Sequence, residues 1–465
     1  MFVERLHVKH LKLLRDFTLD FSTADGAPRM WTVIIGPNGT AKTTILQAIA
    51  LAAAGPLQAN SLAKSVVGHL VDRRGGGRKS MEIDVDFRFS ERGSDARLHP
   101  LLGRTLAEDE RLRSSLSLKY KQSTLLGTSA YVGPEGPLPV KSTSKPSPLD
   151  DARAGKRPFW FVAGYGVGRF LPEPQARPPL VQPSIERLEP LFRNTTGLTS
   201  LGFLDHLPRK KARHKFAKVL RDTLIGVDEL VPAIKGIELA GRGGVSDSGT
   251  LIDRERFQLK IGRQNYKLPA VALSHGYQST LAWIADLIGH VMWEADDTIE
   301  AADIEGLVLI DEIDLYLHPQ WQAGLIAALR RTFPKVQFVA TTHSPVVLAA
   351  LQPEEIVVLG QNPETGDVER YLPDSATGEF SPASDVTEPG PPPDPRAMSG
   401  TDVYRTWFGL DRLTLNPHGQ LLRDYLLLAG DPSRSIDEDK QMQALRDRLA
   451  QVGIRPRTPV QRDTP

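Results

Sequence analysis

The chain alternates short apolar runs with polar turns, and several of the runs predict strands. WTVII (31–35), the LVLI tract of GLVLIDEID (306–314) and VQFVAT (336–341) are mostly continuous apolar runs, which is typical of buried parallel strands. MEIDVDFRFS (81–90) instead alternates apolar and polar positions, as a strand with one buried face does. These patterns predict an α/β protein built on several separated strands.

Helices and linkers divide the chain between these strands. ILQAIALAAAG has no helix breaker before Gly55, and leucine spacing between 183 and 227 predicts a helical lobe. RFQLKIGRQNYKLPAVAL (256–273) is strand-like. Stretches rich in proline and serine at 133–151 and 381–395 predict a solvent-exposed loop and a linker.

A phosphate-binding loop is predicted between the first strand and the first helix. IGPNGTAKTT (35–44) matches the pattern G-x-x-x-x-G-K-[ST] except that Ala41 replaces the second glycine. If the helix begins at this position, its φ is negative and alanine adopts it freely. Backbone N–H groups and the helix N-terminus would then hold phosphate. The candidate nucleotide-binding residues of the loop are Gly36, Pro37, Asn38, Gly39, Thr40, Ala41, Lys42, Thr43 and Thr44.

Polar residues follow two of the predicted buried strands, at the edge where open α/β sheets bind ligands. Asp311 suits Mg²⁺, together with the hydroxyl of Thr43, and Glu312 suits the orientation or deprotonation of an attacking water. His343, after the next strand, can donate a hydrogen bond to a γ-phosphate or to that water. We therefore expect Glu312 and His343 to be catalytic.

ALSHGYQST (272–280) predicts a second helix N-terminus with small polar residues, Ser274, Gly276 and Gln278. A single nucleotide needs only one phosphate-binding loop, and the loop at 35–44 already supplies it. We therefore expect these residues to close over the nucleotide of a neighbouring subunit, so that two chains enclose two nucleotides.

Composition narrows the class of protein. The chain is 40% hydrophobic and 24% charged, with a net charge of +1 and no cysteine. The absence of cysteine excludes disulfides and thiolate metal sites. The small net charge gives no overall electrostatic attraction to nucleic acid or to a membrane surface. We expect a cytoplasmic protein without a membrane partner. Nucleic acid contact would depend on two local basic stretches, 72–79 and 209–215, which solvated loops and helix faces explain equally well.

Together these motifs resemble those of ABC-type ATPases. GPNGTAKTT is similar to Walker A, LSHGYQ to the ABC signature, LVLIDE to Walker B, IDLYLHPQW to the D-loop region and TTHSP to the switch-histidine motif. The LHPQWQ and TTHSP variants resemble the soluble AAA-labelled branch that includes RecF, overcoming-lysogenization nucleases and defence ATPases. The resemblance covers roughly residues 1–55 and 270–360. A glutamine loop is not obvious, and the tract VAGYGVGR, with Tyr165, Gly166 and Arg169, is the candidate replacement.

The resemblance implies a P-loop NTPase of ABC-ATPase type, with a mixed sheet flanked by helices, a helical lobe and a C-terminal helical segment, and it implies ATP and Mg²⁺ as cofactors. The expected parts are the N-terminal part of the ATPase domain (1–90), a flexible insertion (91–158), a strand, helical lobe and linking strands (159–270), the C-terminal part of the ATPase domain (271–374), a proline-rich linker (375–396) and a helical assembly segment (397–465).

Within this branch, FVAGYGVGR and DVYRTWFGLDRL look most like the ATPase of Septu and retron anti-phage systems, the PtuA family. That family implies self-assembly and a separate HNH-type nuclease gated by nucleotide state, with nucleic acid reached through the complex. The chain shows no acidic cluster of a Toprim nuclease and no HNH-like set of histidines. We expect an ATPase that is not itself a nuclease. The alternative is a RecF- or SMC-like ATPase of DNA repair or maintenance.

Overall fold

The computed structural model of the chain describes residues 1–64, 66–74, 79–93, 95, 97–119, 121–140, 147–155, 157–173, 180–207, 210–225, 233–238, 252, 256–295, 300–373, 380–383, 392–409, 417–430 and 434–454. The chain forms two compact units, Met1–Gly400 and Thr401–Pro465.

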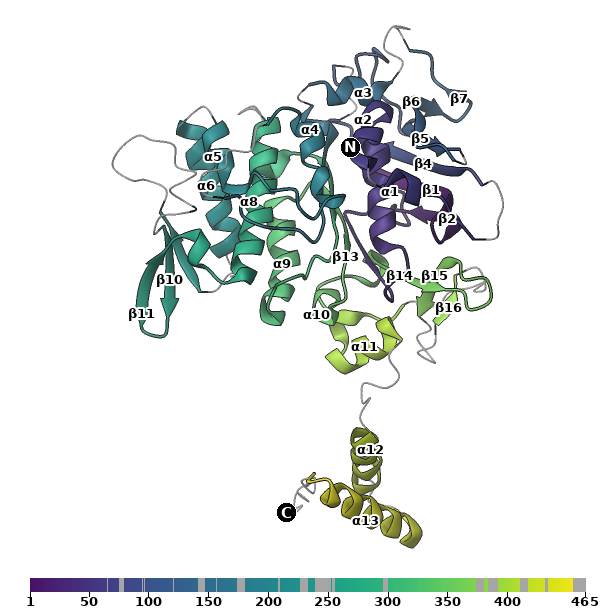
Figure 1. The fold of residues 1–465 in the computed structure, drawn as a ribbon, viewed down its shortest axis with the longest axis vertical. Helices are drawn as coiled ribbons and strands as arrows, with labels where there is room; N and C mark the ends of the chain where they lie inside the picture. The colour runs from purple at the N-terminus through teal and green to yellow at the C-terminus, as the bar shows by residue number, and fades with distance from the viewer. Residues whose placement is uncertain are drawn as a thin grey trace. The chain divides into compact units, whose positions relative to one another are not determined.

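A seven-stranded sheet forms the centre of the larger unit (Figure 1). Its strand order is β16-β15-β14-β3-β13-β12-β8, and the five strands from β14 to β8 are parallel. The bounds are β3 Trp31–Ile35, β8 Phe161–Tyr165, β12 Gly306–Ile310, β13 Val336–Thr341, β14 Ile356–Gln361, β15 Val368–Pro373 and β16 Phe380–Pro382. The three apolar runs expected as buried strands are β3, β12 and β13, and every residue of them is buried. Because parallel strands end at the same edge, the loops after these runs meet.

A second, antiparallel sheet of six strands lies beside the first helix. Its order is β2-β1-β4-β5-β6-β7, with β1 Phe2–Leu11, β2 Leu14–Asp20, β4 Met81–Arg88, β5 Arg111–Leu118, β6 Leu126–Gly133 and β7 Gly136–Pro137. The stretch 91–158, expected as a flexible insertion, therefore contributes two full strands to this sheet. The alternating burial of β5, with Leu112, Leu116 and Leu118 inside, explains why it pairs there.

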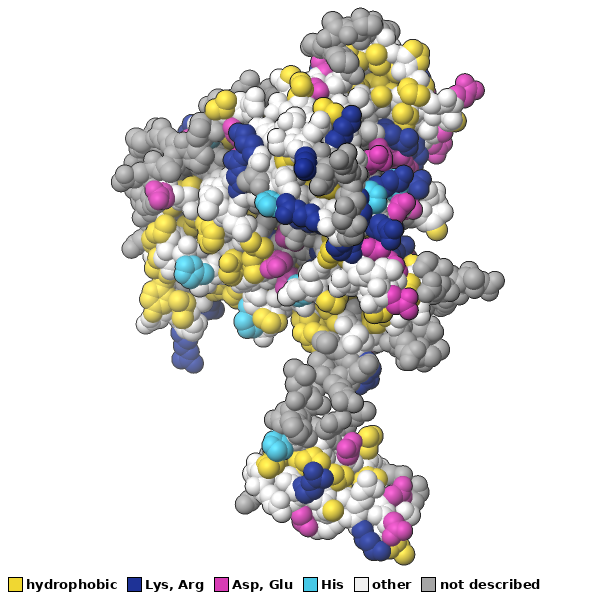
Figure 2. All heavy atoms as spheres, turned by 45° about the vertical axis from the view of Figure 1, so that its right-hand side comes forward, with side chains coloured by type: hydrophobic (Ala, Val, Ile, Leu, Met, Phe, Trp, Pro, Cys, Tyr) yellow, Lys and Arg dark blue, Asp and Glu magenta, His cyan; other side chains and the backbone are white. Residues whose placement is uncertain are grey.

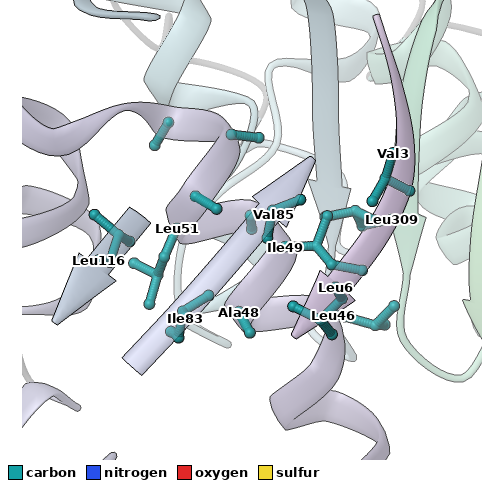
Figure 3. Close-up of a cluster of buried hydrophobic side chains, with 14 of the residues drawn as sticks. Val3, Leu6, Leu46, Ala48, Ile49, Leu51, Ile83, Val85, Leu116 and Leu309 are labelled. Carbon is teal, nitrogen blue, oxygen red and sulfur yellow. The ribbon is translucent and has the colours of Figure 1, made fainter. Parts of the chain in front are cut away.

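Helix α1 (Lys42–Ala54) fills the space between the two sheets. Figure 3 shows Ile49 of α1 beside Val85 of β4 and Leu309 of β12, and Ala48 beside Ile83 of β4. Small alanines let both sheets approach the helix, and nearly every residue of α1 is buried. The helix that begins at the phosphate loop is therefore fixed on both sides.

The remaining helices of this unit are short or lie on the other side of the seven-stranded sheet, where Figure 1 shows α8 and α9. The bounds are α2 Pro56–Ala63, α3 Pro148–Arg153, α4 Pro183–Glu186, α5 Phe203–His206, α6 Lys210–Ile225, α8 His275–Ala295, α9 Pro319–Thr332 and α10 Pro345–Leu348. A three-stranded antiparallel sheet, β11-β10-β9, has bounds β9 Ile234–Ile237, β10 Phe257–Ile261 and β11 Gln264–Leu268. The predicted fold class, an α/β P-loop ATPase of ABC type with a helical lobe, is confirmed by this arrangement.

The smaller unit is helical, as expected. It contains α11 (Gly400–Phe408, whose first residue belongs to the larger unit), α12 (Pro417–Gly430) and α13 (Ile436–Gln451). Tyr425 of α12 packs with Leu445 and Leu449 of α13. Residues 410–416 lie outside the described residues, and so does part of the expected linker. Within the part of the chain that the structure describes, no helix combines the length and the apolar character that crossing a bilayer requires.

Candidate nucleotide-binding and catalytic site

The expected phosphate loop connects β3 to α1 and borders a cavity of about 300 Å³. Gly36 and Gly39 have φ of +150° and +86°, which favours glycine at both positions. At Gly36 a side chain would also meet the carbonyl oxygen of Leu359 at 2.4 Å. The cavity is lined by Lys12, Leu13, Asn38, Gly39, Thr40, Ala41, Lys42, Thr43, Thr44, Asp311, Glu312 and His343.

The backbone of Ala41 differs from the prediction. Helix α1 begins at Lys42, so Ala41 is the residue before the helix, and its φ is +60° with ψ at +18°. The expected negative φ is therefore wrong, because the helix starts one residue later than assumed. A left-handed conformation costs a non-glycine residue roughly 1–2 kcal/mol. The backbone of Ala41 is therefore strained, whereas the sequence predicted a conformation that alanine adopts without strain.

We expect Ala41→Gly to relieve this strain and to raise the free energy of unfolding by up to about 1 kcal/mol, with nucleotide binding retained. Ala48→Gly, inside α1, is the control and should lower it by about 2 kcal/mol, because glycine disfavours a helix interior and the substitution also removes a buried methyl group. Denaturant titration of the three proteins measures both effects. A loss of stability in Ala41→Gly equal to that in the control would contradict the left-handed conformation.

Lys42 lies inside the loop that it belongs to. Its Nζ donates hydrogen bonds to the carbonyl oxygens of Gly36 (2.8 Å) and Pro37 (2.9 Å). Burial lowers the pKa of Lys42, whereas the nearby carboxylates of Asp311 and Glu312 act to raise it. The ammonium group is therefore held in the cradle where phosphate oxygens would arrive.

Asp311 joins three elements at the edge of the central sheet. Its carboxylate accepts hydrogen bonds from the hydroxyls of Thr43 and Thr341, both at 2.7 Å, and its N–H donates to the carbonyl of Tyr165 at 2.8 Å. Mg²⁺ commonly takes one or two carboxylates together with substrate phosphates, so a hydroxyl beside a carboxylate suits it. The described residues contain no group of three or more His, Asp or Glu side chains able to hold a metal by themselves. The Thr43–Asp311 pair thus fits a metal that arrives with a nucleotide.

Glu312 and His343 both face the same cavity, as expected from their positions after β12 and β13. Glu312 has a φ of +49°, which is uncommon for a residue of its size, and its N–H donates to the hydroxyl of Thr341 at 2.7 Å. Strained backbone of this kind is concentrated at functional sites. His343 is exposed to solvent at the cavity.

The second helix N-terminus is not part of this cavity. Ser274 is exposed and precedes α8, and the Gln278 side chain donates to the carbonyls of Val271 (2.9 Å) and Leu273 (2.7 Å). A side chain at Gly276 would meet the carbonyl oxygen of Tyr316 at 2.5 Å. The Gln278 side chain and the backbone of Gly276 therefore have close neighbours within their own chain, whereas the Ser274 side chain is exposed to solvent.

Sequence reasoning missed Lys12, which lies in the turn between β1 and β2. Its Nζ donates to the hydroxyl of Thr44 at 3.2 Å, and burial lowers its pKa. Lys12 lines the cavity together with the loop and adds a second cation to it. No motif marks this lysine, because it belongs to a strand turn far from the loop in sequence.

The tract proposed in place of a glutamine loop lies behind the site. Arg169 is 1% exposed and does not line the cavity. Its guanidinium donates to the backbone carbonyls of Asp311 and Glu312, the latter at 3.0 Å. Burial lowers the pKa of Arg169 to about 10, and the neighbouring carboxylates oppose that shift. Arg169 was expected near the nucleotide, and it reaches the site only indirectly, through the backbone of Asp311 and Glu312.

Some side chains of the two basic stretches pair with acids where the structure describes them. Arg74 and Lys79 both contact Asp72, at 3.0 Å each, and Lys215 contacts Glu300 at 2.7 Å. Residues 75–78 and 209 lie outside the described residues. Figure 2 shows acidic side chains interspersed with the Lys and Arg side chains on one face. Nucleic acid contact through these stretches remains a prediction.

Comparison with known proteins places these motifs among ATPases. Two family models match, one described as "AAA domain" over residues 5–131 and one as "AAA domain, putative AbiEii toxin, Type IV TA system" over residues 171–349. Among solved structures, an SMC head bound to the C-winged helix domain of ScpA matches with a TM-score of 0.47 at 16% identity, covering 82% of this chain and 98% of that chain.

Several curated relatives are similar in sequence. The Septu protein PtuA of Bacillus mycoides is 24% identical over 451 residues, which cover 97% of this chain and 50% of the relative. The Septu protein PtuA of Bacillus thuringiensis is 36% identical over 27% of this chain and 33% of the relative, and the retron Ec83 probable ATPase of Escherichia coli is 38% identical over 24% and 21%. The chain thus spans half or less of the length of these relatives. By its motifs, its fold and these matches, the chain resembles AAA-domain ATPases with an ABC-type architecture, and it is similar in sequence to the Septu PtuA and retron ATPases.

Proposed function

We propose that this chain binds Mg²⁺-ATP and hydrolyses it to ADP and phosphate. The observation that carries the proposal is the convergence of Lys42, the Thr43–Asp311 pair, Glu312 and His343 on one cavity. Lys42 would pair with the β- and γ-phosphates, and Thr43 and Asp311 would hold Mg²⁺, which neutralises the phosphate charge. Glu312 would orient the attacking water, and His343 would donate a hydrogen bond beside it.

The complete site is proposed to form between two copies of the chain. Ser274 is exposed at the start of a 21-residue helix, and it does not line the cavity of its own chain. A helix N-terminus with an exposed hydroxyl suits a phosphate group presented from outside. Ser274 and the backbone beside Gly276 and Gln278 would therefore close over the γ-phosphate bound by a second copy, and the two copies would enclose two nucleotides.

The ATPase is further proposed to serve an anti-phage defence complex and to control a separate HNH-type nuclease. Support comes from relatives that are Septu and retron proteins, with one of them matching along 97% of this chain. The chain itself is proposed not to be a nuclease. In the described residues of the smaller unit, Leu427 and Ile436 are well exposed, which suits an assembly role for this unit.

Val403 and Trp407 are each 1% exposed within the single chain, so these two are not available as exposed anchors of an interface. The exposed residues of α12 and α13 are the better candidates for contact with another protein.

Co-purification with an HNH nuclease encoded beside the chain tests this function. We expect the complex to form and its nuclease activity to differ between ATP and ADP, because the nucleotide would set whether the two copies are closed. A chain ending at Asp394 should bind ATP but lose the nuclease. If no nuclease associates, and DNA alone stimulates ATP hydrolysis, the chain acts on DNA directly and the defence assignment is wrong.

A further inference from the structure

Arg169 occupies a position that the proposed chemistry has not yet used. It lies in the loop after β8, and its side chain is buried behind Asp311 and Glu312. Its Nε donates to the carbonyl of Gly166 at 2.8 Å, and one Nη donates to the carbonyls of both acids. A buried guanidinium is costly unless it is hydrogen-bonded, and here Nε and one Nη are bonded while the other Nη has no hydrogen-bond partner among the described residues.

The hydrogen bond from Arg169 to the Glu312 carbonyl affects where the expected catalytic carboxylate of Glu312 lies. Glu312 has a left-handed backbone, with φ of +49°, and such a conformation persists only where its surroundings enforce it. Three contacts among the described residues hold it: the Thr341 hydroxyl accepts from its N–H, and both Arg169 and the N–H of Leu315 (2.9 Å) donate to its carbonyl. Arg169 is the side chain among these that reaches the Glu312 carbonyl, and it helps to fix the backbone that directs the carboxylate into the cavity.

The other side of Arg169 contacts helix α8. Its guanidinium lies over the Trp283 ring, 5.8 Å from the ring centre. At the end of β8, the Tyr165 hydroxyl donates to Asp286 of α8 at 3.1 Å, while the Tyr165 carbonyl accepts from the N–H of Asp311. Helix α8 begins directly after Ser274. The end of β8 and the loop after it thus join the helix that would meet a second copy to the two acids of this copy.

We infer that Arg169 is a positioning residue that couples helix α8 to the carboxylate of Glu312. The inference rests on the proposed ATPase function and deepens it. A displacement of α8, through Trp283, would move the guanidinium and with it the carbonyl of Glu312. Closure of a second copy onto Ser274 would in this way align the attacking water in the first copy. Arg169 should matter for cleavage of ATP and not for its binding.

Arg169→Lys tests this, because a single ammonium cannot replace both the Nε that bonds Gly166 and the Nη that bonds the two acids, and it lacks the planar group that stacks on an indole. We expect kcat to fall about 100-fold, as small misplacements of catalytic groups do, while the Kd for ATP stays within about threefold. Arg187→Lys is the matched control: Arg187 is equally buried, stacks on Phe161 and donates to a β8 carbonyl, but it does not contact either acid. The control should lose thermal stability without a comparable loss of kcat.

Three outcomes are distinguishable. If the wild type does not hydrolyse ATP, the proposed function itself fails. If the wild type hydrolyses ATP, the inference is overturned by any of three results for Arg169→Lys. These are a kcat equal to that of the wild type, an affinity for ATP that falls by as large a factor as kcat does, or changes in kcat and thermal stability like those of Arg187→Lys. Should Arg169→Lys not fold, Trp283→Phe serves instead. Its smaller ring should weaken the stacking and lower kcat about tenfold with an unchanged Kd, and a normal kcat would likewise overturn the inference.

Discussion

Lys42→Ala should lose nucleotide binding, whereas Glu312→Gln should bind ATP and fail to cleave it. Removing the ammonium takes charge-assisted bonds from the β- and γ-phosphates, worth about 3 kcal/mol or roughly 100-fold in Kd. Glutamine keeps the size of Glu312 but cannot accept a proton, so hydrolysis should fall by about 100- to 10,000-fold. Equilibrium binding of a fluorescent ATP analogue and release of phosphate measure the two effects separately.

Exposed residues supply the controls. Lys335→Ala and Glu354→Gln change the same charges at solvent-exposed positions outside the cavity, and both should behave as the wild type. Equal and normal turnover in Lys42→Ala and Glu312→Gln would overturn the assignment of the site. If both variants lose ATP binding, Glu312 serves in binding the metal or the nucleotide and not in orienting the attacking water.

The residues of the site were predictable where a contiguous stretch carries the chemistry. Lys42 and Thr43 follow a glycine-rich loop, and Asp311 and Glu312 follow a buried strand, so local pattern alone indicated phosphate and metal chemistry. The structure brings these stretches to one cavity because β3, β12 and β13 are parallel and end at the same edge.

Residues that reach the site from elsewhere in the sequence were not predictable in the same way. Lys12 lines the cavity from a strand turn that no motif marks. The tract that contains Arg169 was singled out by resemblance, but its hydrogen bonds to backbone carbonyls leave no trace in a sequence pattern. Lys12 reaches the site because the two sheets pack around α1, and Arg169 reaches it because β8 pairs with β12. A single sequence shows neither the packing nor the pairing that results from it.

Two small residues stood out in the sequence, but the structural role of each differs from the expected one. Ala41 was expected in a helix, and a shift of the helix start by one residue places it in a left-handed conformation instead. Gly276 was expected to approach a ligand, and it lies against the carbonyl of Tyr316 in its own chain. The strand β5 escaped detection for another reason: serines alternate with leucines in RLRSSLSL, and the buried Ser114 hydroxyl donates to the carbonyl of Ala52.

The contact of Gly276 also decides how the composite site should be tested. Any side chain at this position would disturb the chain that carries it, so its effect on a second copy could not be isolated. Ser274 is exposed and precedes α8, where aspartate caps a helix as well as serine does. Ser274→Asp should therefore fold normally while it places a carboxylate against the γ-phosphate of the other copy. Ser274→Asn is the neutral control with the same capping ability.

Ser274→Asp should abolish most ATP hydrolysis by like-charge repulsion, while Ser274→Asn keeps most of it. Mixing Ser274→Asp with Lys42→Ala should restore hydrolysis, because in a mixed dimer the intact Lys42 of one chain meets the intact Ser274 of the other. Equal mixing makes about half of the dimers mixed, each with one complete site of two, so about a quarter of wild-type activity is expected. Differently tagged chains show by co-purification that subunits exchange. If exchange is demonstrated and activity does not return, each site is built within one chain, and the exposed Ser274 has no part in it.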